Sequence, residues 1–217
     1  MNGFSHSPKL TKAALVAIDP DNPLASVIIF QYNPERLSRT LQTRAATRDG
    51  AAEEILRLQG APKETISVSE LVLDAADQLE KGDPQAGQLG IHPQLATLEM
   101  LLYPRSRHVI ANTALLQTGA MEVLPPEAPL TLFVWGVKRV VPVQITGFSV
   151  SETFYDPRLN PVHATLNLDM TVLTYSDFPL EHTGRHLFMA HQIAKEAMAV
   201  VGSVEGISAA GLESIGI

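Results

Sequence analysis

Cysteine is absent from this chain of 217 residues. Its absence excludes disulfides, thiolate zinc sites, iron–sulfur clusters and cysteine nucleophiles. Charged residues are also scarce, at 18% of the chain against about 25% in an average soluble protein. A chain that is 45% hydrophobic with so few charges is typical of a protein that buries part of its surface in an assembly.

The chain also lacks basic runs and long apolar runs. No run of Lys or Arg exceeds two residues, and 16 basic residues stand against 23 acidic ones. Nucleic-acid binding requires a basic footprint, so no nucleic-acid partner is expected. No apolar run approaches the roughly 18 residues of a membrane span, and the first residues have no signal-peptide core. We expect a soluble, cytoplasmic protein that does not insert into membranes by itself.

The clearest pattern in the sequence is an alternation of apolar and polar residues over 139–175. In its second half the apolar residues all share one parity: Leu166, Leu168, Met170 and Val172. In its first half the apolar parity flips at Gly147, as it does where a β-bulge adds one residue and bends a strand. Two prolines and two Asx residues in 155–161 predict the turn. The pattern therefore predicts a long bent hairpin, of the kind that forms the wall of a small barrel.

Other segments predict further strands and a few helices. The expected strands are 13–18, 25–32, 37–44, 64–73 and 130–135. Leucines at helical spacing predict a helix from His92 to Tyr103-Pro104, and an apolar stripe predicts another over 183–201. A short helix is expected before Gly82 and a single helical turn near 53–58, while 105–129 are expected to be irregular.

These elements predict an α+β, mainly β fold: a bent antiparallel β-barrel with flanking helices. We expect a flexible arm over 1–10 and the barrel over 11–180. Loop insertions are expected at 45–62 and 74–91. The final segment, 181–217, is expected to be a helix followed by a mobile tail from Gly202.

The best candidate for a chemical site is a group of three histidines. His182 and His186 are one helical turn apart, and His191 follows at a spacing that places it on another face of the helix. Glu181 is adjacent but not in the position of a HExxH motif. A metal- or ligand-binding barrel enzyme that uses these histidines stays open as an alternative. The favoured interpretation has no catalytic, cofactor-binding or metal-binding residue, and no cofactor.

Two other residues have a structural and a functional interpretation. His163 lies on the polar parity of the hairpin, which favours an interface or a lumen over a catalytic base. Trp135 ends an apolar strand, which favours a core anchor over a ligand platform. The serines lie in turns and on strand faces, and no Gly-x-Ser-x-Gly elbow or phosphate loop is present.

One segment and several later motifs together resemble a known family. The segment 30–39 resembles the aromatic-x-(Phe/Tyr)-Asn-Pro-x-x-Leu-x-Arg signature of the tube-like proteins of contractile injection systems, which are phage-tail-like particles. The residues that match it are Tyr32, Asn33, Pro34, Leu37 and Arg39. Further matches are the Leu-rich helix that ends at Tyr103-Pro104, the turn at Trp135-Gly136, and the run 148–175, which follows Gly147 and has Asn160-Pro161 in its core. The resemblance covers roughly residues 10–175.

The resemblance implies a fold and a place in a particle. The fold is that of the phage tail tube, in which six copies form a ring around a channel. Strand residues of the long hairpins would line this channel, which suits the polar strand faces with Ser38, Thr40, Gln42, Asn167, Asp169 and Thr171. Many relatives continue into a LysM module; only 42 residues follow Tyr175, and we expect that module to be absent.

The resemblance therefore predicts a non-enzymatic baseplate protein. Its ring would join the spike hub to the inner tube and template the assembly of that tube. The implied partners are other copies of the chain, the spike hub protein, the inner tube protein and baseplate wedge proteins. The main inner-tube subunit of the same particle stays open as an alternative.

Overall fold

The computed structural model describes residues 12–19, 22–30, 32–34, 36–44, 58–117 and 128–209. Side chains are described over the same ranges, apart from residues 19, 22–26 and 204–209. The arm expected over 1–10, and most of the loop expected over 45–62, lie outside the described residues.

Seven strands and five helices form the described part of the chain. The strands are β1 (Ala14–Asp19), β2 (Asn22–Ile29), β3 (Leu37–Gln42), β4 (Lys63–Asp74), β5 (Leu130–Val134), β6 (Val140–Tyr155) and β7 (Pro161–Val172). The helices are α1 (Ala76–Glu80), α2 (Pro84–Leu89), α3 (His92–Glu99), α4 (Ser106–Gln117) and α5 (Thr183–Ala209). Each predicted strand coincides with one of these strands, and the predicted mainly β fold is confirmed.

All seven strands belong to one antiparallel sheet in the order β2-β1-β5-β6-β7-β4-β3. Among the described residues the outermost strands, β2 and β3, each pair with one neighbour only. The sheet of a single chain is therefore bent but open. Its two edges leave backbone groups available for pairing with another chain.

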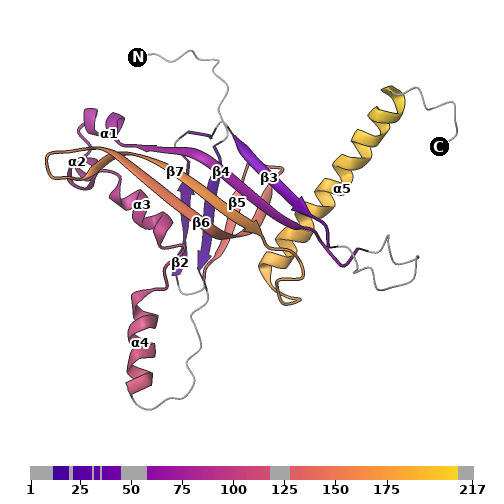
Figure 1. Ribbon diagram of the computed structural model, residues 1–217, viewed down its shortest axis with the longest axis horizontal. Helices are drawn as coiled ribbons and strands as arrows, with labels where there is room; N and C mark the ends of the chain where they lie inside the picture. The colour runs from indigo at the N-terminus through magenta and orange to yellow at the C-terminus, as the bar shows by residue number, and fades with distance from the viewer. Residues whose placement is uncertain are drawn as a thin grey trace.

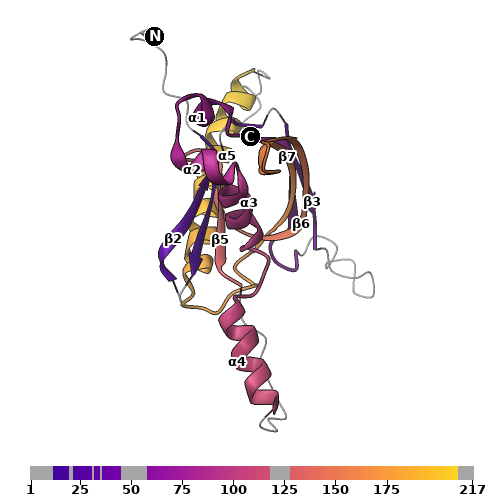
Figure 2. The ribbon, with the colours of Figure 1, turned by 90° about the vertical axis from the view of Figure 1, so that its left-hand side faces the viewer.

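The sheet folds back on itself around a single core. Figure 2 shows β2 and β5 on one side, β3, β6 and β7 on the other, and α3 between them. Fully buried side chains come from both halves of the sheet and from the turn before α3: Leu15, Ile66, Ile91, Phe133, Leu166, Leu168 and Met170. Because the sheet wraps around α3, most of the apolar strand face is covered by the chain itself.

The bend in β6 lies where the sequence predicts it. Pairing with β7 shifts between Ile145, which faces Met170, and Gly147, which faces Asp169, so Thr146 is the extra residue of a bulge. A Cβ at Gly147 would lie 3.0 Å from the Asp169 carboxylate, so a side chain here would push that carboxylate away. The predicted alternation does not extend to the strand end, because Phe154 is 75% exposed.

A second bulge, in β4, was not predicted. Pairing with β7 shifts between Val68 and Leu71, and Glu70 adopts the left-handed region with a φ of 59°. The backbone N–H of Glu70 instead donates to Oδ1 of Asn167 at 3.1 Å. A side chain of β7 thereby satisfies a donor that the ladder leaves unpaired.

The insertion between β4 and α3 contains α1 and α2, and it packs against the turn of the β6–β7 hairpin. Asp83 caps α2, because its Oδ1 accepts from the N–H groups of Gln85 and Ala86. The N–H of Ile91 donates to the carbonyl of Pro161 at 2.9 Å. Figure 1 shows α1 and α2 beside this turn, at the left-hand end of the molecule.

The expectation that residues 105–129 are irregular is wrong for 106–117, which form α4. None of its residues is buried, and it points away from the sheet (Figure 1). Since burial on one face produces the helical periodicity that sequence reveals, a helix that buries nothing leaves a weak signal. Val109, Ile110, Leu115 and Leu116 are all about half exposed or more.

The last helix is longer than predicted. α5 continues to Ala209, through Gly202, where a mobile tail was expected to begin. Glycine inside a helix costs only about 1 kcal/mol, which the rest of a 27-residue helix tolerates. The first half of α5 packs against the sheet, while its end projects beyond the strands in Figure 1. Among the described helices, none is long and apolar enough to cross a membrane.

Candidate functional site

One face of the sheet carries small polar side chains across four strands, β3, β4, β7 and β6. In an antiparallel sheet, residues directly opposite each other lie on the same face. The register places the following residues in rows on this face: Thr40, Thr65, Thr171 and Gln144; Ser38, Ser67 and Asp169; Asn167 and Ser149; Thr165 and Ser151; His163 and Thr153. We call these residues the polar face.

Hydrogen bonds between neighbouring strands hold the polar face in place. The Ser67 hydroxyl donates to Oδ1 of Asp169 at 2.6 Å, which joins β4 to β7. Nδ2 of Asn167 donates to the Ser149 hydroxyl at 3.2 Å, which joins β7 to β6. The Thr153 hydroxyl and Nδ1 of His163 are 2.8 Å apart. These bonds fix side chains that would otherwise be free to rotate.

The chemistry of the polar face is that of a wet, weakly charged wall. Its groups are mostly hydroxyls and amides, with a carboxylate at Asp169. At its ends the register adds Asp74, opposite His163, and Lys63, opposite Gln42. Neutral hydroxyls and amides exchange hydrogen bonds with water easily and hold no strong counterion or ligand. Thr153 and His163 form the one hydroxyl–imidazole pair among these residues. The face suits passage of hydrated solutes better than their capture.

The motif residues of the 32–39 segment lie in the connection from β2 to β3 and in the first residues of β3. Pro34 is buried, and Oδ1 of Asn33 accepts from the N–H of Ala13 at 2.9 Å, just before β1. Tyr32 is 55% exposed, and Leu37 packs against the core. Asn33 therefore holds the chain after β2 close to the start of β1. Leu41 of β3 is half exposed, because β3 is an edge strand.

The later motif residues lie at the two turns of the β5–β6–β7 meander. Trp135 is partly buried against the core, with its ring 5.7 Å from that of Phe133. Pro161 is fully buried. Nδ2 of Asn160 donates to the carbonyl of Gln88 at 3.0 Å and to Oδ2 of Asp156 at 2.8 Å. Asn160 thus ties the hairpin turn to α2.

The structure does not bring the three candidate histidines together. The ring of His182 stacks on Phe178 at 4.6 Å, and its Nδ1 accepts from the N–H of Gly184. His186 is exposed, whereas His191 is buried against the sheet. Across the described ranges no three potential metal ligands of the His, Asp or Glu type gather. The arrangement gives no support to the enzyme alternative.

His191 instead lies beside a buried carboxylate that the sequence analysis did not single out. Glu64 of β4 is only 6% exposed. Its Oε1 lies 2.6 Å from both Nε and Nη2 of Arg39, and its Oε2 lies 3.6 Å from Nζ of Lys195. Through these contacts Glu64 links β3 to α5. Desolvation lowers the pKa of Arg139, and the positive charge of the nearby Arg39 lowers it further. The Glu64 carboxylate opposes this shift.

Burial lowers the pKa of His191, and the positive charge of Lys195 lowers it further. The Glu64 carboxylate opposes this shift only in part, and Arg139 and Arg39 add to it. The neutral imidazole is therefore the form that folding favours. In the unfolded chain the imidazole has its ordinary pKa of about 6.5 and takes up a proton more readily.

The pKa of His191 predicts that the free energy of unfolding falls as the pH drops below about 6.5. The unfolded chain binds more protons there, so the contribution of His191 is fully present above that pH and is lost toward the lower folded pKa. Urea denaturation at pH 7.5 and 5.5 measures the free energy of unfolding at each pH. His191→Gln should reduce the difference between these two free energies, whereas His186→Gln, an exposed control, should leave that difference unchanged. An equally steep profile in His191→Gln would refute this assignment.

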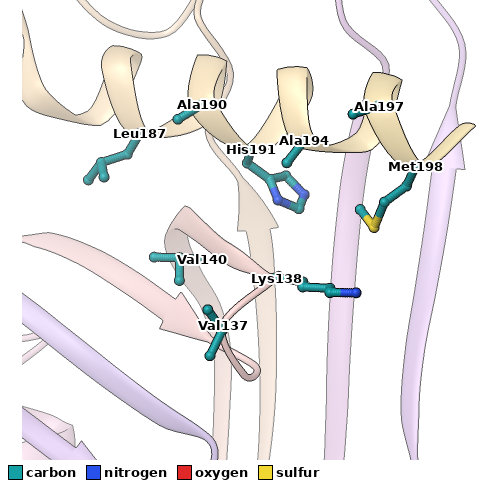
Figure 3. Close-up of a pocket in the computed structure, with 9 residues that line it drawn as sticks. All are labelled: Val137, Lys138, Val140, Leu187, Ala190, His191, Ala194, Ala197 and Met198. Carbon is teal, nitrogen blue, oxygen red and sulfur yellow. The ribbon is translucent and has the colours of Figure 1, made fainter. Parts of the chain in front are cut away.

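A shallow apolar groove of about 410 Å³ runs between α5 and the β5–β6 turn. Figure 3 shows the helix above and the turn below, with His191 and Met198 pointing down toward Lys138 and the turn. Val137 is 94% exposed, although it is apolar. We call this feature the α5 groove. Lys138 and His191 are the polar residues that line it.

Sequence reasoning missed both Glu64 and the α5 groove. Glu64 is the first residue of the strand predicted over 64–73, where a charged residue is unremarkable. Its partners Arg39 and Lys195 are far away in the sequence, so no local spacing reveals them. The sequence did offer one signal for the groove, which is an apolar residue, Val137, in the short turn between β5 and β6.

Comparison with known proteins gives distant structural similarity only. No family model matches the chain, and no curated protein matches it. One similar chain comes from the tail of an empty gene transfer agent particle with C6 symmetry. It shares 16% identity, with 74% of this chain and 90% of that chain covered and a TM-score of 0.30. Another comes from the virion of a native gene transfer agent particle, with 15% identity, the same coverages and a TM-score of 0.29. Similarity at this level does not establish a shared fold.

Proposed function

We propose that this protein is a structural, non-enzymatic component of a phage-tail-like particle, in which a ring of copies surrounds a channel. The polar face is the observation that carries the proposal. Four neighbouring strands present hydroxyls and amides to solvent, while their other face forms the core. A solvated polar face is common on antiparallel sheets, and the strand-built wall of a water-filled channel needs one that carries little charge.

The unpaired edges and the exposed apolar side chains support assembly. The edge strand β2 exposes Val27 and Ile29 by more than half, and α4 exposes Ile110 by 69%. Exposed apolar patches on soluble proteins mark contacts with other proteins. A helix of twelve residues that buries nothing is marginal in water, so α4 also gains stability from a partner.

Within such a particle we propose the place that the family resemblance implies. One side of the ring sits on the spike hub, and the other presents a template on which the first ring of the inner tube forms. The segments 45–62 and 74–91 are proposed to contact adjacent rings. The second of these contains α1 and α2, which lie at one end of the long strands (Figure 1).

Seeding of tube growth tests this role. Purified spike hub and inner tube proteins are mixed with and without this protein, and tubes attached to hubs are counted by electron microscopy. We expect attached tubes only when the protein is present. Equal numbers of tubes in its absence would refute the role of initiator. Long tubes made of this protein alone would instead identify it as the main tube subunit.

A further inference from the structure

The turn of the β6–β7 hairpin presents three apolar side chains to solvent. Phe154 and Leu159 are 75% and 78% exposed, and Tyr155 is 51% exposed. We call these three residues the hairpin knob. Isolated exposed apolar residues are common, but three at the tip of one hairpin form a patch that favours a protein partner.

The backbone at the hairpin knob is strained. Phe154 has a φ of 56° and Leu159 a φ of 64°, both in the left-handed region that bulky L-residues rarely adopt. Each such residue costs on the order of 1 kcal/mol and persists only where its surroundings impose it. Strain at two residues that are also exposed and apolar indicates that their side chains are displayed for contact.

Hydrogen bonds fix the turn that carries Leu159, and the Phe154 ring packs edge-on against the His163 ring at 6.0 Å. Oδ1 of Asp156 accepts from the N–H groups of Arg158 and Asn160 at 2.7 and 2.8 Å. The Asp156 N–H donates to the carbonyl of Asn160 at 2.9 Å, and the Leu159 N–H donates to the carbonyl of Asp156 at 3.0 Å. The Asn160 amide lowers the pKa of Asp156, which stays ionised at neutral pH. The hairpin knob is therefore rigid before it meets a partner, which lowers the entropy cost of binding.

The charges around the hairpin knob differ in sign from those around the α5 groove. Near the knob, acidic residues of the hairpin and of the adjoining α1–α2 segment outnumber Lys81 and Arg158: Asp74, Asp77, Glu80, Asp83, Glu152 and Asp156. Near the groove, three cations surround the buried Glu64, which are Arg39, Arg139 and Lys195, and Lys138 lines the groove itself. Glu196 lies on the face of α5 away from the groove, since it is two residues, or about 200° of helical rotation, from Ala194.

The two features also lie at different ends of the molecule. Figure 1 shows the β6–β7 turn at the left, beside α1 and α2, and α5 on the right. The apolar hairpin knob with acidic surroundings and the apolar α5 groove with basic surroundings are therefore complementary but cannot meet within one chain. Surfaces of this kind join copies head to tail, and such heterologous contacts close into rings when the rotation permits.

We infer that the hairpin knob of one copy docks into the α5 groove of a second copy of this chain. This inference rests on the proposed ring and names the contact that holds neighbouring copies together. Leu159 and Phe154 cover the apolar floor formed by Ala194 and Met198. The acidic α1–α2 end approaches Lys138 and Arg139, which orients the two copies and steers their encounter.

Cross-linking of single-cysteine variants tests the contact, because the natural chain has no cysteine. Leu159→Cys and Ala194→Cys are purified separately, mixed and oxidised, and the rate of covalent dimer formation is measured. We expect this pair to cross-link at least about tenfold faster than Leu159→Cys with Glu196→Cys, because docking raises the effective concentration of the two thiols. Glu196 is a suitable control, since it is exposed on the side of α5 away from the groove.

The outcomes separate this inference from the proposed function. Equal rates for the two pairs would overturn the contact, whatever assembly the wild-type chain forms. If the wild type seeds tubes but the first pair shows no faster cross-linking, the proposed function stands and another contact closes the ring. If the first pair cross-links faster but no tubes are seeded, the contact stands and the proposed function fails.

Discussion

Gly90→Ala is expected to destabilise the protein by about 3 kcal/mol or more, the largest effect that we predict for a single substitution. Gly90 follows α2 with a φ of 56° and a ψ of −133°, a combination that only glycine adopts readily. A Cβ there would also overlap the carbonyl oxygen of Pro161. The backbone has to move, and the hydrogen bond from Ile91 to that carbonyl is lost.

Gly136→Ala is the matched control for this prediction. Gly136 has a φ of 74°, but a Cβ there would meet nothing within 4 Å. Gly136→Ala should therefore lower the free energy of unfolding only by the cost of the left-handed backbone, about 1 kcal/mol. Urea denaturation of the two variants measures the difference. Equal destabilisation would show that the junction of α2, α3 and the β6–β7 hairpin is not tightly packed, which would contradict the account of the rigid hairpin knob.

Glu64→Gln is expected to destabilise the protein by about 2 kcal/mol. The substitution leaves Arg39 and Lys195 without their carboxylate, beside the buried His191. Removing one partner of a fully buried ion pair costs about 3–5 kcal/mol. The side chains of Arg39 and Lys195 are 26% and 39% exposed, so both cations recover part of their hydration and the cost is smaller.

The control for Glu64→Gln is Glu152→Gln, which removes a carboxylate that is exposed on β6. Urea denaturation is expected to show almost no change for Glu152→Gln. Hydrogen exchange provides a second readout, because Glu64 links β4 to α5. We expect faster exchange in the first half of α5 in Glu64→Gln. Unchanged exchange together with an unchanged unfolding free energy would show that this ion pair does not hold α5.

The strands were predictable because their pattern is local. Leu166, Leu168 and Met170 alternate with polar residues, since β7 has one buried face and one polar face. The bulge at Gly147 was visible as a parity flip marked by a glycine. The bulge in β4 shows the same flip between Val68 and Leu71, but no glycine marks it, and the Asn167 side chain that satisfies it is distant in the sequence.

The parts that sequence analysis missed depend on distant or absent neighbours. The cluster around Glu64 joins residues from β3, β4 and α5, and only the fold brings them together. α4 buries no side chain, so no periodic burial marked it as a helix. The hairpin knob was missed because Phe154 continues the alternation of apolar residues that predicts a buried side chain. Its left-handed backbone, which the sequence does not reveal, turns the side chain to solvent.

The central claim is that the polar face lines a channel, and accessibility of a cysteine in the assembled particle tests it most directly. Ser151 is exposed on the polar face of β6, and its hydroxyl makes no hydrogen bond among the described residues. Ser151→Cys is assembled with hub and tube and treated with either a small maleimide or a maleimide attached to a globular protein. The same variant before assembly is the control and should react with both reagents.

In the assembled particle we predict that Ser151→Cys reacts with the small maleimide and is protected from the protein-linked one. Water and small solutes enter the channel, whereas a folded protein does not reach its wall. Labelling by the protein-linked reagent at the rate of the unassembled variant would show that the polar face is on the outside of the particle. That result would contradict the account.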